Sequence, residues 1–123
     1  MKSTSIWPDS TSWQGKILFW ESSEEQPSED QVKYWLRNYA AQGILKNIKG
    51  LLVGRSQMNS QWEQKNYDNV CLQVIRDEEK LDIPIITNMD FGHTDPMFTL
   101  PYGVSYTIDC DQRKITIDEN CCL

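Results

Sequence analysis

The sequence predicts an α/β domain with a mainly parallel central sheet, two flanking helices and a C-terminal antiparallel hairpin. Three short apolar runs, typical of buried strands, alternate with two segments whose apolar residues recur at helical spacing. Two segments nearer the C-terminus alternate apolar and polar residues, as half-buried strands do. The order strand-helix-strand-helix-strand favours parallel pairing with right-handed crossovers.

The chain opens with a segment that has no hydrophobic period. Residues 1–15 are rich in Ser, Trp, Pro and Asp, which favours a linker or arm. The apolar run at residues 16–20 then predicts the first buried strand. We therefore predict an interdomain arm over 1–15 and a domain over 16–123, with Trp7 and Trp13 packing against a neighbouring domain.

The first helix has clear start and stop motifs. Ser28 and Gln31 fit a capping box, and Gly43 suits the left-handed position after the last turn. Glu29 and Asp30 lie where the positive end of the helix dipole favours carboxylates. One face should be buried, and its apolar residues are Val32, Trp35, Leu36, Tyr39 and Ala40.

The remaining elements follow from the same patterns. Residues 50–54 predict a second buried strand, and residues 83–87 a third that begins near Pro84. The helix between them is marked by apolar residues at helical spacing: Tyr67, Val70, Cys71, Val74 and Ile75. Alternation in 104–108 and 115–117, around a polar turn at residues 110–113, predicts the hairpin.

Composition argues against several classes of partner. The formal net charge of -6 disfavours nucleic acid, whose phosphates need a basic face. No run approaches the roughly 20 apolar residues of a membrane span, and the N-terminus has no signal-peptide core, so we expect a cytoplasmic protein without a membrane partner. The four cysteines form no CxxC pair and the chain has one histidine, so we expect reduced thiols, no disulfide and no metal.

Polar residues follow each of the three predicted parallel strands. Glu21 ends the first, Arg55 and Ser56 end the second, and residues 88–96, which contain His93, end the third. Ligands of open parallel sheets collect at the carboxyl ends of the strands. We therefore expect a carboxylate, a guanidinium, a hydroxyl and an imidazole to meet at one edge.

Glu21 and His93 are the candidates for chemistry at this edge. A carboxylate can orient a histidine and stabilise its charged form, and histidine is a frequent general base near neutral pH. The alternative is a strand-end carboxylate and a surface histidine, both facing water.

Arg55, Ser56 and Asp90 are candidates for substrate contact. Arg55 could clamp a carboxylate through two parallel hydrogen bonds, or instead form an ion pair within the domain. Ser56 has a hydroxyl, but the sequence places no base beside it. Asp90, like Asp95, could equally stabilise a turn.

Four segments resemble the C-terminal domain of the serine LD-carboxypeptidase and microcin C self-immunity family. They are residues 18–25, 50–55, 88–96 and 100–104, and they occur in the family's order over nearly the whole chain. The histidine-containing segment is the most specific. The sequence Phe-Trp-Glu-Ser-Ser at 19–23 is more similar to the microcin branch of the family than to the murein-recycling branch.

The resemblance implies a two-domain serine peptidase without metal or organic cofactor. The C-terminal domain is a swivelling β/β/α domain that carries Glu21 and His93 of a Ser-Glu-His triad. The serine belongs to an N-terminal domain upstream of Met1, and we expect no Gly-x-Ser nucleophile turn anywhere in this chain. We therefore expect a fragment that is inactive alone and that forms a homodimer through the surface its partner domain would cover. Family substrates are peptides cleaved at an L-D bond, or peptidyl and aminoacyl nucleotides of the microcin C type.

Two alternatives remain beside this interpretation. The chain could be a non-catalytic binding or interaction domain in which Glu21 and His93 are idle. It could also be a thiol-based redox or metal protein that uses Cys121 and Cys122, which the lack of a CxxC pair and of a second histidine disfavours.

Overall fold

A three-stranded parallel sheet forms the centre of the protein, which a computed structural model describes for residues 8–22, 26–57 and 61–120. The strands β1 (Ile17–Trp20), β2 (Gly50–Gly54) and β3 (Ile85–Met89) lie in sequence order. An antiparallel pair, β4 (Tyr106–Asp109) and β5 (Lys114–Ile117), follows as a separate hairpin. The predicted α/β class, the parallel pairing and the C-terminal hairpin are confirmed.

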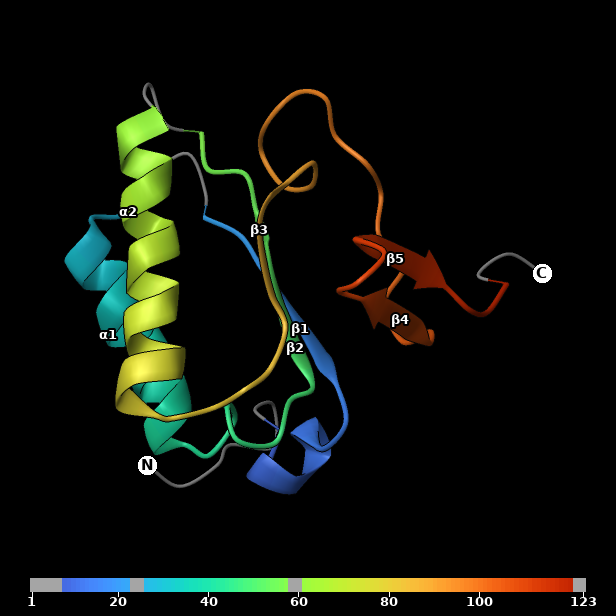
Figure 1. Ribbon diagram of the computed structural model, residues 1–123, viewed down its shortest axis with the longest axis horizontal. Coiled ribbons are helices and arrows are strands. Elements are labelled where there is room, and N and C mark those ends of the chain that lie inside the picture. The colour runs from blue at the N-terminus through green and yellow to red at the C-terminus, as the bar shows by residue number, and fades with distance from the viewer. Residues whose placement is uncertain (1–7, 23–25, 58–60, 121–123) are drawn as a thin grey trace.

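Two helices cover one face of the sheet, and the hairpin lies on the other side (Figure 1). They are α1 (Glu29–Ala41) and α2 (Gln61–Leu72), which continues as a π-helical turn, η2 (Gln73–Glu78). Successive crossovers of one hand that advance in one direction across a sheet place their helices on the same face. The strand order β1-β2-β3 therefore accounts for both helices packing together.

The predicted start and stop of α1 are confirmed. The Ser28 hydroxyl accepts a hydrogen bond from the backbone of Gln31 at 3.3 Å, and the Gln31 side chain accepts one from the backbone of Ser28 at 2.8 Å. Gly43 has φ +75°, the left-handed conformation that follows many helices. A capping box therefore marks the start of this helix, and a left-handed glycine follows its end.

The hydrophobic core lies between the helices and the sheet. Strand β2 is buried along its whole length, as expected for a central strand covered on both faces. The five apolar positions predicted for the second helix are all buried. The side of the sheet away from the helices is covered by the hairpin segment, and a Cβ on Gly50 would lie 2.9 Å from Ile108 Cδ1.

Three predictions about the core and its boundaries were wrong. Trp13 lies in a short 3-10 helix, Ser10–Trp13, and packs against the core of this chain, whereas packing against a neighbouring domain was predicted. Trp35 is 41% exposed and contacts Trp20 at the margin of the core, because its position on α1 falls at the edge of the buried stripe. Strand β3 begins two residues later than predicted, because Pro84 lacks the N–H that a ladder needs.

The described cysteines, Cys71 and Cys110, are both free thiols, one buried and one exposed. Trp7, Cys121 and Cys122 lie outside the described residues. Within the described ranges, none of the helices has the length and apolar character that crossing a membrane requires.

Candidate functional site

The carboxyl ends of the three parallel strands bring the predicted residues together. Glu21 follows β1 directly, and His93 lies in the loop after β3. The Nδ1 atom of His93 is 3.3 Å from Oε2 of Glu21, although the two residues are 72 positions apart. Their side chains are 44% and 40% exposed, so the pair lies at the surface where a further molecule can reach it. An imidazole held by a carboxylate in this way can accept a proton at its other nitrogen.

The loop that carries His93 folds back onto the sheet. Phe91 is 7% exposed, and its ring meets the edge of Phe19 from β1 at a centroid distance of 5.9 Å. The backbone of Phe91 passes so near β2 that a Cβ on Gly54 would lie 2.6 Å from its carbonyl oxygen. The backbone N–H of Phe98 donates to the carbonyl of Asp90 at 2.7 Å and closes the loop. Buried aromatic contacts therefore fix the base of the loop while His93 stays accessible.

Arg55 and Asp90 form an ion pair beside the histidine loop. One guanidinium nitrogen, Nη2, bonds the Asp90 carboxylate, and Nε donates to the Asn88 side chain at 3.2 Å. Both members of the pair are about one-third exposed. Of the two interpretations of Arg55, the ion pair within the domain is the one the structure contains.

An irregularity in β3 makes this pairing possible. The register between β2 and β3 shifts between Leu52 and Gly54, so that β3 contains one residue more than β2 over the same stretch. Asn88 lies at this bulge with φ +58°, a left-handed conformation that asparagine tolerates better than most residues. Bulges redirect the side chains that follow them, and here Asp90 comes to face Arg55. The bulge was not expected from the sequence; an asparagine near the end of a strand is the feature that could have indicated it.

Ser56 is buried and pairs with another serine. It is 6% exposed, and the hydroxyl of Ser22 donates to its oxygen at 3.0 Å. Ser22 follows Glu21 directly, so this bond ties the end of β1 to the segment after β2. Ser56 thereby supports the edge on which Glu21 lies. Ser22 was not among the residues expected from the sequence to form this edge.

The expectation of no nucleophile turn needs a correction. Two Gly-x-Ser triplets do occur, at residues 54–56 and 103–105. The serine of the first is the buried Ser56, and the hydroxyl of Ser105 donates to the carboxylate of Glu119. Neither of these two hydrogen bonds involves the imidazole of His93.

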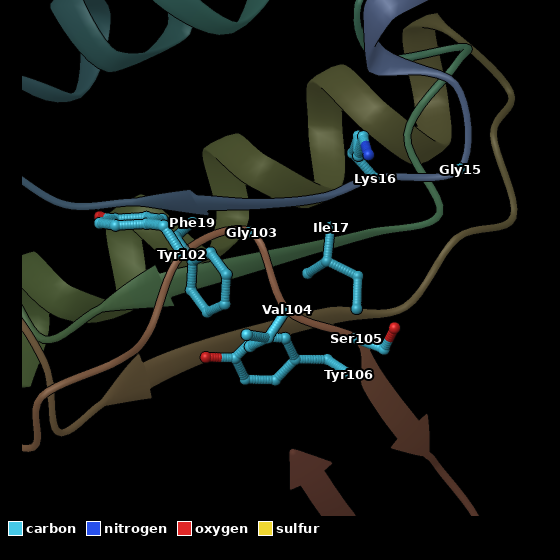
Figure 2. A pocket seen from close by; sticks show the side chains of 9 residues that line it. All are labelled: Gly15, Lys16, Ile17, Phe19, Tyr102, Gly103, Val104, Ser105 and Tyr106. Atoms are coloured by element: carbon cyan, nitrogen blue, oxygen red, sulfur yellow. The ribbon is translucent and has the colours of Figure 1, made fainter. Parts of the chain in front are cut away.

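A pocket of about 310 Å³ lies between β1 and the segment that leads into β4 (Figure 2). The side chains of Phe19, Tyr102 and Tyr106 line it, and both tyrosine rings meet Phe19 edge-on, at 5.9 and 5.3 Å. Its lining includes neither Glu21 nor His93. The candidate chemistry is therefore at the strand ends, and the pocket belongs to the packing between β1 and the hairpin segment.

Comparisons with known proteins place the chain in a family. A family model described as the LD-carboxypeptidase C-terminal domain matches residues 1–108. The microcin C7 self-immunity protein MccF of Escherichia coli is 27% identical over 105 residues, which cover 85% of this chain and 29% of that protein.

Solved structures agree with this placement. An MccF-like protein from Streptococcus pneumoniae, in complex with AMP, has a TM-score of 0.77 and 35% identity, over 92% of this chain and 31% of that one. A muramoyltetrapeptide carboxypeptidase from Oxalobacter formigenes has a TM-score of 0.63 and 32% identity, over 83% of this chain and 35% of that one. The chain thus spans about a third of the length of these relatives. By sequence and by fold, it belongs to the LD-carboxypeptidase C-terminal domain family.

Proposed function

We propose that this chain supplies the glutamate and the histidine of a Ser-Glu-His triad in a serine peptidase or amide hydrolase. The observation that carries the proposal is the contact between His93 Nδ1 and Glu21 Oε2 at 3.3 Å. An unrelated surface histidine has no reason to meet a carboxylate from another strand end. The distance is slightly longer than an ideal hydrogen bond, as is common for catalytic pairs without substrate.

The role of each residue follows from this geometry. Nδ1 of His93 donates to Glu21, so Nε2 carries the lone pair that takes the proton of the nucleophilic serine. Glu21 holds the ring in that tautomer and stabilises the imidazolium while the serine attacks the scissile carbonyl. His93 then protonates the leaving amine and later activates the water that releases the acyl-enzyme.

The nucleophile belongs to a second domain in this proposal. The two serines that follow a Gly-x pair within the described residues are bonded to Ser22 and Glu119, and the chain spans about a third of its relatives. We place the serine in an N-terminal nucleophile domain, so that residues 1–15 connect the two domains. Hydrolysis by this chain alone is then not expected.

The histidine loop has features suited to contact with such a domain. Met97 and Phe98, four and five residues after His93, are 62% and 65% exposed. Contiguous apolar patches at the surface mark interfaces more often than single exposed apolar residues do, and Met97 and Phe98 are adjacent in the chain. In the isolated chain the same surface would favour a homodimer. A cytoplasmic location is part of the proposal.

Two substrate classes fit the family. One is a murein peptide with a C-terminal L-D bond, and the other is a peptidyl or aminoacyl nucleotide of the microcin C type. The MccF-like neighbour exceeds the muramoyltetrapeptide carboxypeptidase in TM-score, 0.77 against 0.63, and slightly in identity. We therefore favour the nucleotide class. Contact of Arg55, Ser56 and Asp90 with substrate stays a prediction, in which Arg55 would use the donors left free by Asp90.

A chimaera provides the test of the triad. The 123-residue chain is fused behind the nucleophile domain of the S. pneumoniae relative and assayed with an L-D tetrapeptide and with an aminoacyl-sulfamoyl adenosine. We expect turnover of the nucleotide compound. His93→Ala should then lower kcat by about 10⁴-fold or more, and Glu21→Gln nearly as much, by analogy with other triads.

The control is Glu79→Gln, which changes an exposed carboxylate at the end of η2 and should leave kcat within about twofold. Near-normal activity of the His93→Ala chimaera would end the catalytic interpretation. It would favour the alternative of a non-catalytic binding or interaction domain. Preference for the tetrapeptide would retain the triad and reverse the choice of substrate.

A further inference from the structure

Gly92 lies directly against the carboxylate of Glu21. An ideal Cβ built on Gly92 would be 2.0 Å from Oε2 of Glu21, 3.1 Å from Cδ and 3.3 Å from Cβ. Side chains do not tolerate a contact of 2.0 Å, so one group would have to move. The oxygen in question is the one that faces Nδ1 of His93. Because Gly92 has no side chain, the carboxylate of Glu21 can occupy this space and contact His93.

We infer that Gly92 is a positioning residue, whose lack of a side chain lets the Glu21 carboxylate hold His93 in its Nδ1–H tautomer. The catalytic consequence rests on the proposed triad, but the tautomer does not. Glu21 is the flexible partner in the overlap, and its side chain is 40% exposed. A side chain at position 92 would therefore push the carboxylate into solvent and leave the fold largely intact.

The backbone conformation at position 92 also favours glycine, independently of the contact with Glu21. Gly92 has φ +104°, a region that residues with a Cβ rarely adopt. Gly103, farther along the same connection, has φ +78° and nothing within 4 Å of its ideal Cβ. Gly103→Ala therefore also places a Cβ on a backbone of positive φ, but without the steric overlap, which makes it the control for Gly92→Ala.

The measurement uses the fact that the chain contains one histidine. The ¹⁵N shifts of its two ring nitrogens, recorded at a pH where the ring is neutral, report the ratio of Nδ1–H to Nε2–H tautomers in the purified 123-residue chain. We expect Nδ1–H to dominate in the native chain. In Gly92→Ala the ratio should fall about tenfold or more, because a hydrogen bond to a charged acceptor is typically worth at least that in an equilibrium.

A double-mutant comparison identifies the partner through which Gly92 acts. Glu21→Ala should lower the tautomer ratio as Gly92→Ala does, and adding Gly92→Ala to it should change the ratio no further, because the group to be displaced is gone. Backbone ¹H–¹⁵N spectra establish that each variant is folded. Gly103→Ala should retain the native ratio.

Three outcomes would overturn the inference. They are a native ratio in folded Gly92→Ala, an equal change in Gly103→Ala, or a further change when Gly92→Ala is added to Glu21→Ala. None of these measurements depends on a serine or on turnover. An inactive chimaera with the expected tautomer ratios would therefore count against the proposed function and leave the positioning role of Gly92 standing.

Discussion

Cys71 and Cys110 are both free thiols, but their surroundings give them different chemistry. Cys71 is fully buried on α2, while Cys110 is exposed in the turn between β4 and β5. Burial, with a smaller contribution from the charge of Asp68, raises the pKa of Cys71 from 9.0 to about 12. Its thiolate, the form that reacts, is therefore about a thousandfold scarcer than that of an ordinary thiol.

Alkylation should separate the two residues. Iodoacetamide at pH 8 should modify Cys110 readily and leave Cys71 unmodified while the chain is folded. Tryptic mapping by mass spectrometry distinguishes them, because Arg76 and Lys80 lie between them in the sequence. Adding urea should make both react at similar rates. Equal reactivity in the folded chain would contradict the buried environment of Cys71.

The site at the residue scale depends on small side chains as much as on charged ones. Gly54 allows the backbone of Phe91 to pass beside β2, and Gly92 leaves room for the carboxylate of Glu21. Asn88 accepts the left-handed conformation at the bulge before Asp90. None of these three residues carries a titratable group, but they make room for, or orient, the histidine loop, the Glu21 carboxylate and Asp90.

At the scale of elements, a capping box stabilises the start of α1, and an ion pair with η2 stabilises the part nearer its end. Ser28→Ala removes the side-chain acceptor for the backbone N–H of Gln31. We expect this variant to lower the free energy of unfolding by about 1 kcal/mol, the usual value of an N-cap. Urea denaturation measures it, and Ser28→Asp, which keeps an acceptor, should recover most of the loss.

Arg37 and Glu78 join α1 to η2. Nε and Nη2 of Arg37 donate to the two carboxylate oxygens of Glu78 at 2.8 and 2.7 Å. The hydrogen bonds from Arg37 lower the pKa of Glu78 below its ordinary value of 4.5. Because the folded pKa is the lower one, the pair stabilises the protein above about pH 4.5, and this stabilisation is lost as pH falls through the folded value.

Arg37→Met should therefore be less stable than the native chain at pH 7, by a modest amount because the pair is exposed to solvent and screened. The difference in Tm should shrink on acidification below pH 4.5. Lys49→Met, which removes an exposed cation elsewhere, should show no such pH dependence. A difference in Tm that is independent of pH would show that Arg37 acts through packing and not through the ion pair.

At the scale of the whole molecule, Phe19 connects three parts of the fold. From β1, its ring meets Phe91 in the histidine loop, Tyr102 in the connection that follows, and Tyr106 in β4, all edge-on within 5.9 Å. Edge-to-face pairs of this kind each add about 0.5–1.5 kcal/mol to the effect of burial. Phe19 therefore links both the hairpin and the loop that carries His93 to the sheet.

Phe19→Ala should destabilise the chain by about 2–4 kcal/mol, because it removes a large half-buried ring and its aromatic partners. Amide hydrogen exchange should speed up in β4 and β5 more than in β2, which the helices still cover. Tyr34→Ala, at a site 65% exposed, should change stability by less than about 0.5 kcal/mol. Uniform loss of protection across all strands would mean that the hairpin does not depend on Phe19 in particular.

The sequence by itself determined the elements, their order and the edge where polar residues gather. Helical periodicity, the capping box at Ser28 and the alternation near Ile108 and Ile115 are local properties, so they can be recognised without a structure. The convergence of Glu21 and His93 followed from the rule that parallel strands point their carboxyl ends to one edge.

Only the tertiary structure decided which atoms meet at that edge. Arg55 pairs with Asp90, and Ser56 bonds Ser22, across more than 30 positions of the chain. The packing of Trp13 against the core depends on the shape of the whole core. The demand for glycine at position 92 likewise comes from a carboxylate 71 positions earlier in the chain. Periodicity assigns a residue to a face or an edge, but contacts among side chains arise only when the packed backbone fixes their separations, and no local pattern encodes those distances.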